Sequence, residues 1–200
     1  VEKIMTNLRG GMDMKTYMGL YTAIHNFCTA QKAVAGSSFA ANNNRGGAHL
    51  LGEDLYQHLI EYLKAHLADV QAKSREHVDE ALLTFYIKEW NRYTTAGQYN
   101  NHLFRYLNRH WVKREMDEGK KHIYDIYTLH LVRWKEDMFI GTQESVMRSV
   151  LKLVEKQRNG ETIEQSHIKS VVDSFVSLGL DEADSSKSTL DVYKEYFEKP

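Results

Sequence analysis

The sequence predicts an all-α protein, and two observations carry that prediction. Proline, which kinks or ends helices, occurs once in 200 residues, at Pro200, although an average usage of about 5% would give roughly ten. Apolar residues recur every three or four positions in segment after segment, and no segment has the pattern of a credible strand. With 12 glycines as well, the chain lacks the turn residues that an all-β fold needs.

The first half of the chain divides into five expected helices. The first covers residues 1–8 and ends at Gly10-Gly11, and the second begins after Asp13, an expected N-cap, and runs to about residue 30. The small, polar and aperiodic residues 31–47 predict a loop. The apolar spacing then predicts three more helices, over residues 53–67, 78–90 and 99–118.

Four further helices are expected in the second half. Apolar spacing predicts one over residues 123–134 and another that starts near Thr142 and stops at Asn159-Gly160. Thr162 lies three residues before Gln165, the spacing of a capping box, and predicts the start of a helix that Gly179 closes. An acidic, serine-rich loop over residues 181–188 precedes a ninth helix, which the end of the chain is expected to cut off.

The charge balance argues against functions that depend on a strong electrostatic field. The chain has 26 Lys and Arg residues against 27 Asp and Glu residues, a net charge of −1, so neither nucleic acid nor an anionic membrane is an expected partner. No apolar run approaches the ~18 residues of a membrane span. The single Cys28 cannot form an internal disulfide and fits a reducing compartment.

Ten histidines raise the question of a metal site. The densest set is His58, Glu61 and His66, with His49 and His77 outside that helix, and it lacks the Glu-x-x-His and His-Glu-x-x-His patterns of metal-binding helices. We therefore expect no metal and no cofactor. A helical-bundle metalloprotein stays as the alternative from a different class, and metal analysis of the protein would decide it.

No pattern predicts a catalytic centre. His25 lies three residues before Cys28, but Cys28 falls in the apolar periodicity, which favours a buried structural thiol over a nucleophile. The glycine pairs at residues 10–11 and 46–47 lack the spacing of a phosphate-binding loop.

Two helices carry unusual surfaces. On the fifth, Arg105, Arg109 and Lys113 are spaced i, i+4, i+8 beside Tyr106 and His110, which predicts a solvated face or, as a weaker alternative, an RNA-binding face. The second has two stripes, which together span more than the ~100° of one core-facing stripe. The stripes are Tyr17, Met18, Tyr21 and His25, and Leu20, Ile24, Phe27 and Cys28. This helix is therefore either fully buried or leaves a Tyr- and Met-rich stripe for a partner.

At these residues the sequence resembles the cullin family, specifically the N-terminal domain of SCF-class cullins, the scaffolds of SCF-type ubiquitin ligases. The matching segments span nearly the whole chain in the family's order. They are Tyr17-Met-Gly-Leu-Tyr-Thr22, Asn26-Phe-Cys-Thr29, Gly46-Gly-Ala48 through Leu55-Tyr56, Tyr106-Leu-Asn-Arg-His-Trp-Val112, Glu115-x-Asp-Glu-Gly119, Ile123-Tyr-Asp-Ile-Tyr127, Val150-Leu-Lys-Leu-Val-Glu-Lys156, Arg158-Asn-Gly-Glu-Thr162 and Val192-Tyr-Lys-Glu195.

The resemblance implies a helical solenoid of five-helix cullin repeats that acts as a rigid, non-catalytic scaffold in the cytoplasm and nucleus. Residues 1–119 would form the first repeat, with its first helix truncated, and residues 120–200 an incomplete second one. The implied partner is a Skp-type adaptor that carries F-box substrate receptors, and an exchange factor that competes with it is a further partner. A RING protein would bind only through a C-terminal domain that this chain lacks.

The resemblance also implies which residues bind the adaptor. Tyr17, Met18, Tyr21 and His25 match the family's adaptor-contacting positions on the second helix. Tyr106 and Arg109 match such positions on the fifth helix. Two residues depart from the family pattern: Gly19 stands where a glutamate is usual, and His25 where an aromatic residue is common. A cullin of another class, with a BTB-type adaptor, remains the alternative.

Overall fold

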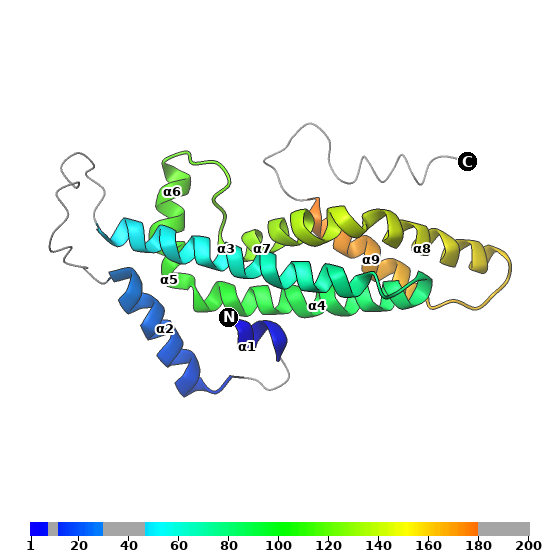
Figure 1. The fold of residues 1–200 in the computed structure, drawn as a ribbon, viewed down its shortest axis with the longest axis horizontal. Helices are drawn as coiled ribbons and strands as arrows, with labels where there is room; N and C mark the ends of the chain where they lie inside the picture. The colour runs from blue at the N-terminus through cyan, green and yellow to red at the C-terminus, as the bar shows by residue number, and fades with distance from the viewer. Residues whose placement is uncertain (8–11, 30–46, 180–200) are drawn as a thin grey trace. The chain divides into compact units, whose positions relative to one another are not determined.

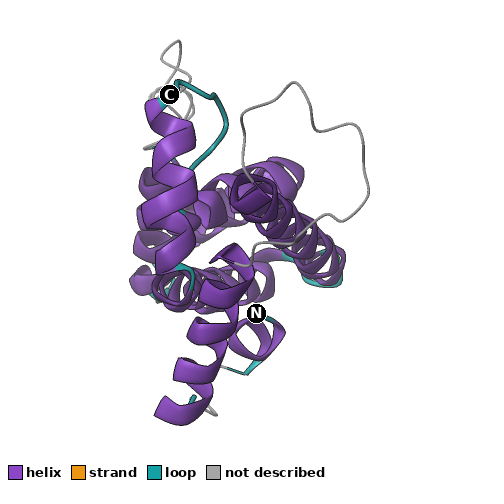
Figure 2. Cartoon of the chain, turned by 90° about the vertical axis from the view of Figure 1, so that its left-hand side faces the viewer, coloured by secondary structure: helices purple, strands orange, loops and turns teal. Residues whose placement is uncertain are grey.

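The computed structural model describes residues 1–7, 12–29 and 47–179, with side chains in the third segment from Leu51 onward. Every regular segment in these ranges is helical, as Figure 2 shows, which agrees with the predicted all-α class. The loop expected at 31–47 falls, apart from its last residue, outside the described residues, and so does the helix expected from Thr189.

Figure 1 shows the order of the elements along the chain. They are α1 (Glu2–Thr6), α2 (Met14–Thr29), α3 (Gly47–Ser74), α4 (Asp79–Leu103), α5 (Arg105–Leu107), the π-helical turn η2 (Asn108–Val112), α6 (Lys113–Asp117), α7 (Ile126–Arg133), the π-helical turn η3 (Trp134–Phe139), α8 (Ile140–Arg158) and α9 (Gln165–Leu178).

The chain forms two compact units, and α3 and α4 contribute residues to both. The first unit comprises Val1–Leu63 and Thr95–Leu129, and the second Lys64–Thr94 and His130–Pro200. Each unit has its own buried apolar core. The largest fully buried side chains are Met5, Tyr56, Leu63, Leu103, Leu107 and Ile126 in the first unit, and Leu67, Leu83, Tyr86, Tyr93, Trp134 and Met138 in the second.

Helix α4 is longer than the sequence predicts. The expected fifth helix from residue 99 is wrong, because α4 continues through Tyr99 to Leu103 and the break comes at Phe104. Burial explains the continuity. Ala96 and Asn100 are fully buried, and the Asn100 amide donates to the Met5 sulfur at 3.5 Å, so packing stabilises a helical stretch whose own residues are poor helix formers.

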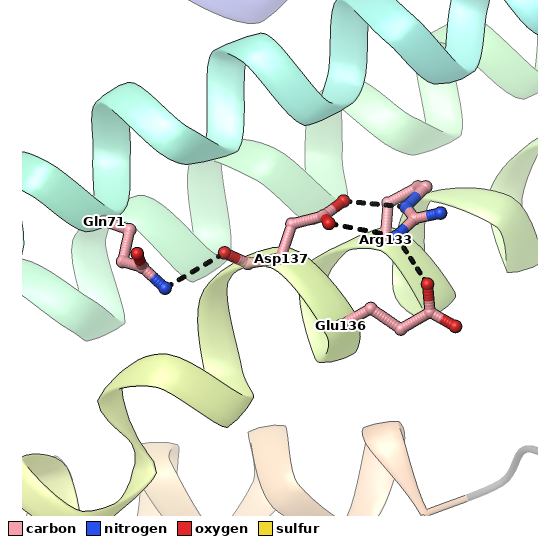
Figure 3. A network of polar contacts seen from close by, with 4 residues as sticks. All are labelled: Gln71, Arg133, Glu136 and Asp137. Carbon is pink, nitrogen blue, oxygen red and sulfur yellow. Dashed lines mark hydrogen bonds and ion pairs between the residues drawn. The ribbon is translucent and has the colours of Figure 1, made fainter.

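The expected break before Thr142 is also absent. α7, η3 and α8 run without interruption from Ile126 to Arg158, and Thr142 lies buried inside α8 with its hydroxyl donating to the Met138 carbonyl at 2.9 Å. The π-helical turn η3 stands where the sequence predicts a loop. A side chain of α3 binds this turn: the Gln71 amide donates a hydrogen bond to the Asp137 carbonyl at 3.2 Å (Figure 3).

A charged network also spans the same turn. Figure 3 shows the Arg133 guanidinium bound to the Asp137 carboxylate by two hydrogen bonds of 2.7 and 3.0 Å, and also paired with Glu136. The bidentate pair spans residues i and i+4 across the turn, so it adds to the support that Gln71 gives to η3.

Side-chain N-caps are present at the start of two helices and absent from a third, where the sequence predicts one. Asp13 caps α2, accepting the Thr16 N–H at 2.9 Å, as the sequence predicts. Asp125 caps α7 in the same way, accepting the N–H groups of Tyr127 and Thr128. The capping box expected at Thr162 is wrong: α9 begins at Gln165 after Glu164, without a side-chain cap.

Candidate functional site

Helix α2 lies on the surface of the first unit. Cys28 is its one buried residue, and the exposed fractions of Met14 and Met18 are 74% and 50%. The interpretation of this helix as fully buried is therefore wrong. Tyr17, Tyr21, Ile24 and His25 are half-buried, which leaves the Tyr and Met stripe partly open to solvent.

The segment α5–η2 packs beside α2 and presents a row of cationic and aromatic side chains. Leu107 and Trp111 anchor this segment in the core, with 1% and 5% of their surfaces exposed. Other residues of the segment are more open to solvent: Tyr106, just before Leu107, is half-buried, and Arg109 and His110 are exposed. The helix axis changes direction at Phe104, so α5 and α6 leave the end of α4 at a steep angle (Figure 1).

A groove of about 400 Å³ runs between these two walls, and we call it the α2–α5 groove. Its lining comprises Tyr17, Met18, Tyr21, Arg105, Tyr106, Arg109 and His110. The structure thus brings five of the six sequence-predicted site residues together. The sixth, His25, lies behind the lining, with its ring edge against the Tyr106 ring at a centroid distance of 4.6 Å.

Ring contacts and one hydrogen bond fix the shape of the groove. Tyr106 lies between His25 and His110, whose ring centroid is 4.3 Å from that of Tyr106. The Tyr17 hydroxyl donates to the His102 carbonyl at 3.4 Å, which ties α2 to the end of α4. The aromatic wall is therefore held in place before any partner binds.

The charge of the groove has one sign. Arg105 and Arg109 line it, no carboxylate does, and within the described part of the chain no ion pair joins either guanidinium to a carboxylate. Unpaired guanidinium groups beside tyrosine and methionine side chains suit an apolar protein surface that also carries carboxylates. The sequence analysis places Arg105 and His110 on the basic face of the expected fifth helix but not among the adaptor-binding residues, although their spacing of four residues from Arg109 and Tyr106 places them on the same side.

A second, more apolar groove of about 510 Å³ adjoins the first one at Tyr17. Its other lining residues come from α1 and its C-cap, from the start of α2 and the residues just before it, and from the end of α4: Lys3, Ile4, Asn7, Met12, Met14, Tyr99 and His102. Tyr17 therefore separates two hollows on the surface of the first unit.

Cys28 lines a separate cavity that shares Tyr106 and His110 with the α2–α5 groove. Its side chain is 7% exposed and faces this small cavity of about 100 Å³, which Gly52 and Trp111 also line. Burial raises the pKa of the Cys28 thiol, which keeps it protonated and unreactive. The sequence-based interpretation as a buried structural thiol is confirmed.

The histidine side chains on α3 do not come together as ligands of one metal ion. The His58 imidazole bonds to the Asp54 carbonyl at 2.8 Å, and this bond with the Asp54 carboxylate raises the pKa of His58. His66 stacks on Tyr93, and its burial lowers its pKa. Among the residues that the structure describes, no three His, Cys, Asp or Glu side chains are grouped as metal ligands. His49 lies outside the residues whose side chains are described.

Two glycines near the groove differ in the space around them, and substituting them tests how α2 and α3 are packed. A Cβ added at Gly19 on exposed α2 would meet nothing within 4 Å, whereas one at buried Gly52 would lie 2.6 Å from the Trp111 ring. We expect Gly19→Ala to stabilise the protein by about 0.5–1 kcal/mol through helix propensity, and Gly52→Ala to destabilise it by about 1–3 kcal/mol through overpacking. Thermal unfolding followed by circular dichroism measures both. Shifts of the same sign would contradict this description of the two helices.

No helix in the described ranges is both long enough and apolar enough to cross a membrane.

Comparison with known proteins gives a consistent result over the whole chain. The family model for the cullin alpha solenoid domain matches residues 1–200. Cullin-1 of Dictyostelium discoideum is 37% identical over 200 residues, which is 100% of this chain and 26% of that protein. Cell division control protein 53 of Saccharomyces cerevisiae is 37% identical over 92% of this chain and 22% of its own length. Cullin-1 of Schizosaccharomyces pombe is 38% identical over 99% of this chain and 26% of its own length. The chain thus spans about a quarter of the length of these relatives.

Proposed function

This chain belongs to the cullin family, and on that premise we propose that it is the adaptor-binding part of a cullin-1-like scaffold. The adaptor is of the Skp type and carries F-box substrate receptors. The scaffold itself performs no chemistry: it holds a substrate receptor near a catalytic module, which raises the effective concentration of one near the other. In this scheme the RING partner binds a region beyond this chain, and an exchange factor competes with the adaptor.

The observation that carries the proposal is the α2–α5 groove. The two walls come from the segments that contain Tyr17-Met18 and Tyr106-Leu-Asn-Arg109, and both are among the segments through which the sequence resembles the cullin family. The groove combines exposed apolar and aromatic surface with two guanidinium groups, the composition that is favoured at the centre of protein–protein interfaces. We assign Tyr17, Met18, Tyr21, Tyr106 and Arg109 to direct contact and His25 to support of Tyr106.

We also propose that residues 1–119 form the first cullin repeat and residues 120–200 part of a second one. The repeats describe helix order in the family, whereas the two compact units describe packing, and the boundaries differ because α3 and α4 contribute to both units. Action in the cytoplasm and nucleus belongs to the same proposal, and the protonated, buried Cys28 is compatible with a reducing compartment.

Binding to two adaptor classes tests the proposal. We expect isothermal titration calorimetry to give a saturable complex of this chain with a Skp-type adaptor bound to an F-box segment, and no heat of binding with a BTB-type adaptor. The reason is that the groove presents a fixed set of side chains, and specificity depends on their fit to one partner. Preference for the BTB-type adaptor would assign the chain to another cullin class, and binding of neither would refute the proposal.

A further inference from the structure

Two side-chain amides meet where the chain turns from α4 into α5–η2. Asn101 lies near the end of α4, and Asn108 is the first residue of η2. The Asn108 Nδ2 donates to the Asn101 Oδ1 at 2.7 Å, and both side chains are half-buried. The bond therefore spans the change of direction at Phe104 and links the segments on either side of it.

The same amides also bind the start of α7. The Ile126 N–H donates to the Asn108 Oδ1 at 3.0 Å, and the Tyr127 N–H donates to the Asn101 Oδ1 at 3.3 Å. The first N–H groups of a helix have no acceptor within that helix, so side chains that accept from them bind the helix end. Asn108 thus connects three elements, α4, η2 and α7, and both ends of its amide are used.

Arg109 follows Asn108 directly, in a segment that Leu107 and Trp111 anchor in the core. Tyr106 is held by the rings of His25 and His110, but no hydrogen bond or ion pair to a described residue holds the Arg109 guanidinium. The direction of Arg109 into the α2–α5 groove therefore depends on the backbone of η2. That backbone is held at the preceding residue by the Asn108 amide.

We propose that Asn108 is a positioning residue for adaptor binding and that it acts by holding Arg109 toward the α2–α5 groove. The proposal rests on the proposed function, because it needs the groove to be the binding surface. Asn108 does not line the groove, so its role in binding is through Arg109 and not through contact with the partner. Its role requires an amide, since one end donates and the other accepts.

Asn101 provides a matched control. In the hydrogen bonds described above it acts only through Oδ1, so Asn101→Asp keeps the oxygen that accepts both bonds. The new carboxylate would lie beside that of Asp125, which accepts the same Tyr127 N–H, at a helix N-terminus that favours negative charge. Asn101→Ala removes the acceptor that Asn108 needs. Asn101→Ala therefore breaks the hydrogen bond to Asn108, whereas Asn101→Asp changes the residue and keeps that bond.

The experiment measures the dissociation constant for the Skp-type adaptor by calorimetry, with thermal unfolding of each variant in parallel. We expect Asn108→Ala to weaken binding about tenfold, the effect of losing hydrogen bonds that orient a charged group. We expect Asn101→Ala to weaken it about threefold and Asn101→Asp to leave it within about twofold of the original chain. If Asn108→Ala does not fold, the contrast between the two Asn101 variants decides the question.

An Arg109→Ala background separates positioning from general stabilisation. If Asn108 acts by holding Arg109, Asn108→Ala costs less than about twofold in that background, because the group it positions is gone. An unchanged tenfold cost there, or unaltered binding by Asn108→Ala in the original chain, overturns the proposal. Failure of the proposed function gives a different result, since the original chain would then not bind the adaptor at all.

Discussion

Replacing Tyr17 and Met18 together with alanine is expected to abolish measurable binding to a Skp-type adaptor without loss of helical circular dichroism. Both side chains line the α2–α5 groove, Met18 is 50% exposed and Tyr17 is half-buried, so their removal leaves the core intact. Truncation of a central aromatic or apolar anchor costs about 2 kcal/mol or more. Two such losses amount to about 4 kcal/mol, which is close to a thousandfold in the dissociation constant.

A methionine away from the groove gives the matched control. Met116 on α6 is 51% exposed, almost the same as Met18, and it does not line the α2–α5 groove. Met116→Ala should leave adaptor affinity unchanged, whereas Met18→Ala alone should weaken it by tenfold or more, from about 2 kcal/mol. Equal effects of the two substitutions would place the binding surface elsewhere on the chain.

The second large effect concerns the aromatic core of the second unit. Trp134 is fully buried, with ring centroids of Tyr86, Trp90 and Tyr93 at 5.7, 5.4 and 5.1 Å. Its indole N–H donates to the Tyr86 hydroxyl at 3.4 Å, and that hydroxyl also bonds with Ser174 at 3.2 Å. Burial raises the pKa of Tyr86 to about 12, so the hydroxyl stays protonated and keeps a hydrogen for this network.

We expect Trp134→Ala to lower the free energy of unfolding by about 3–5 kcal/mol, because it removes packed surface and leaves a cavity. Urea unfolding followed by circular dichroism measures this loss as a shift of the midpoint. Val176→Ala on α9, at a side chain that is 43% exposed, is the control and should change stability by less than about 0.5 kcal/mol. A Trp134→Ala effect as small as that of the control would show that these rings are not a packed core.

The sequence predicts which segments are helical because buried side chains on one face repeat every three or four residues. It fails where packing decides the outcome. Ala96 falls between two expected helices and Asn100 near the start of the second one, but both are buried inside the single helix α4. Gly141 looks like a helix breaker, yet a Cβ at this position would clash with the Gln71 side chain that supports η3, so the glycine serves a close approach.

The resemblance to the cullin family implies which residues of the site bind the adaptor, and the structure shows how these residues are arranged. Periodicity left two interpretations of α2 open, because the stripe with Tyr17 and Met18 is apolar enough for either a core or an interface. Only the position of α2 beside α5 distinguishes them. The connection from Asn108 to Asn101 and α7 joins residues up to 26 apart in the sequence, and no local pattern predicts such a bond.

The π-helical turn η3 has a consequence for insertions and deletions in this part of the chain. A π turn of this kind holds one residue more than an α-helical turn, so it takes up an extra residue without changing the helix on either side. Removing one residue between Trp134 and Phe139 would convert the turn to regular α-helix and keep Val146 and Val150 facing the core. The same deletion within α8 would rotate the following residues by about 100° and turn Leu153 toward solvent. The six residues of η3 are thus the place in this long helix where chain length can vary by one at least cost.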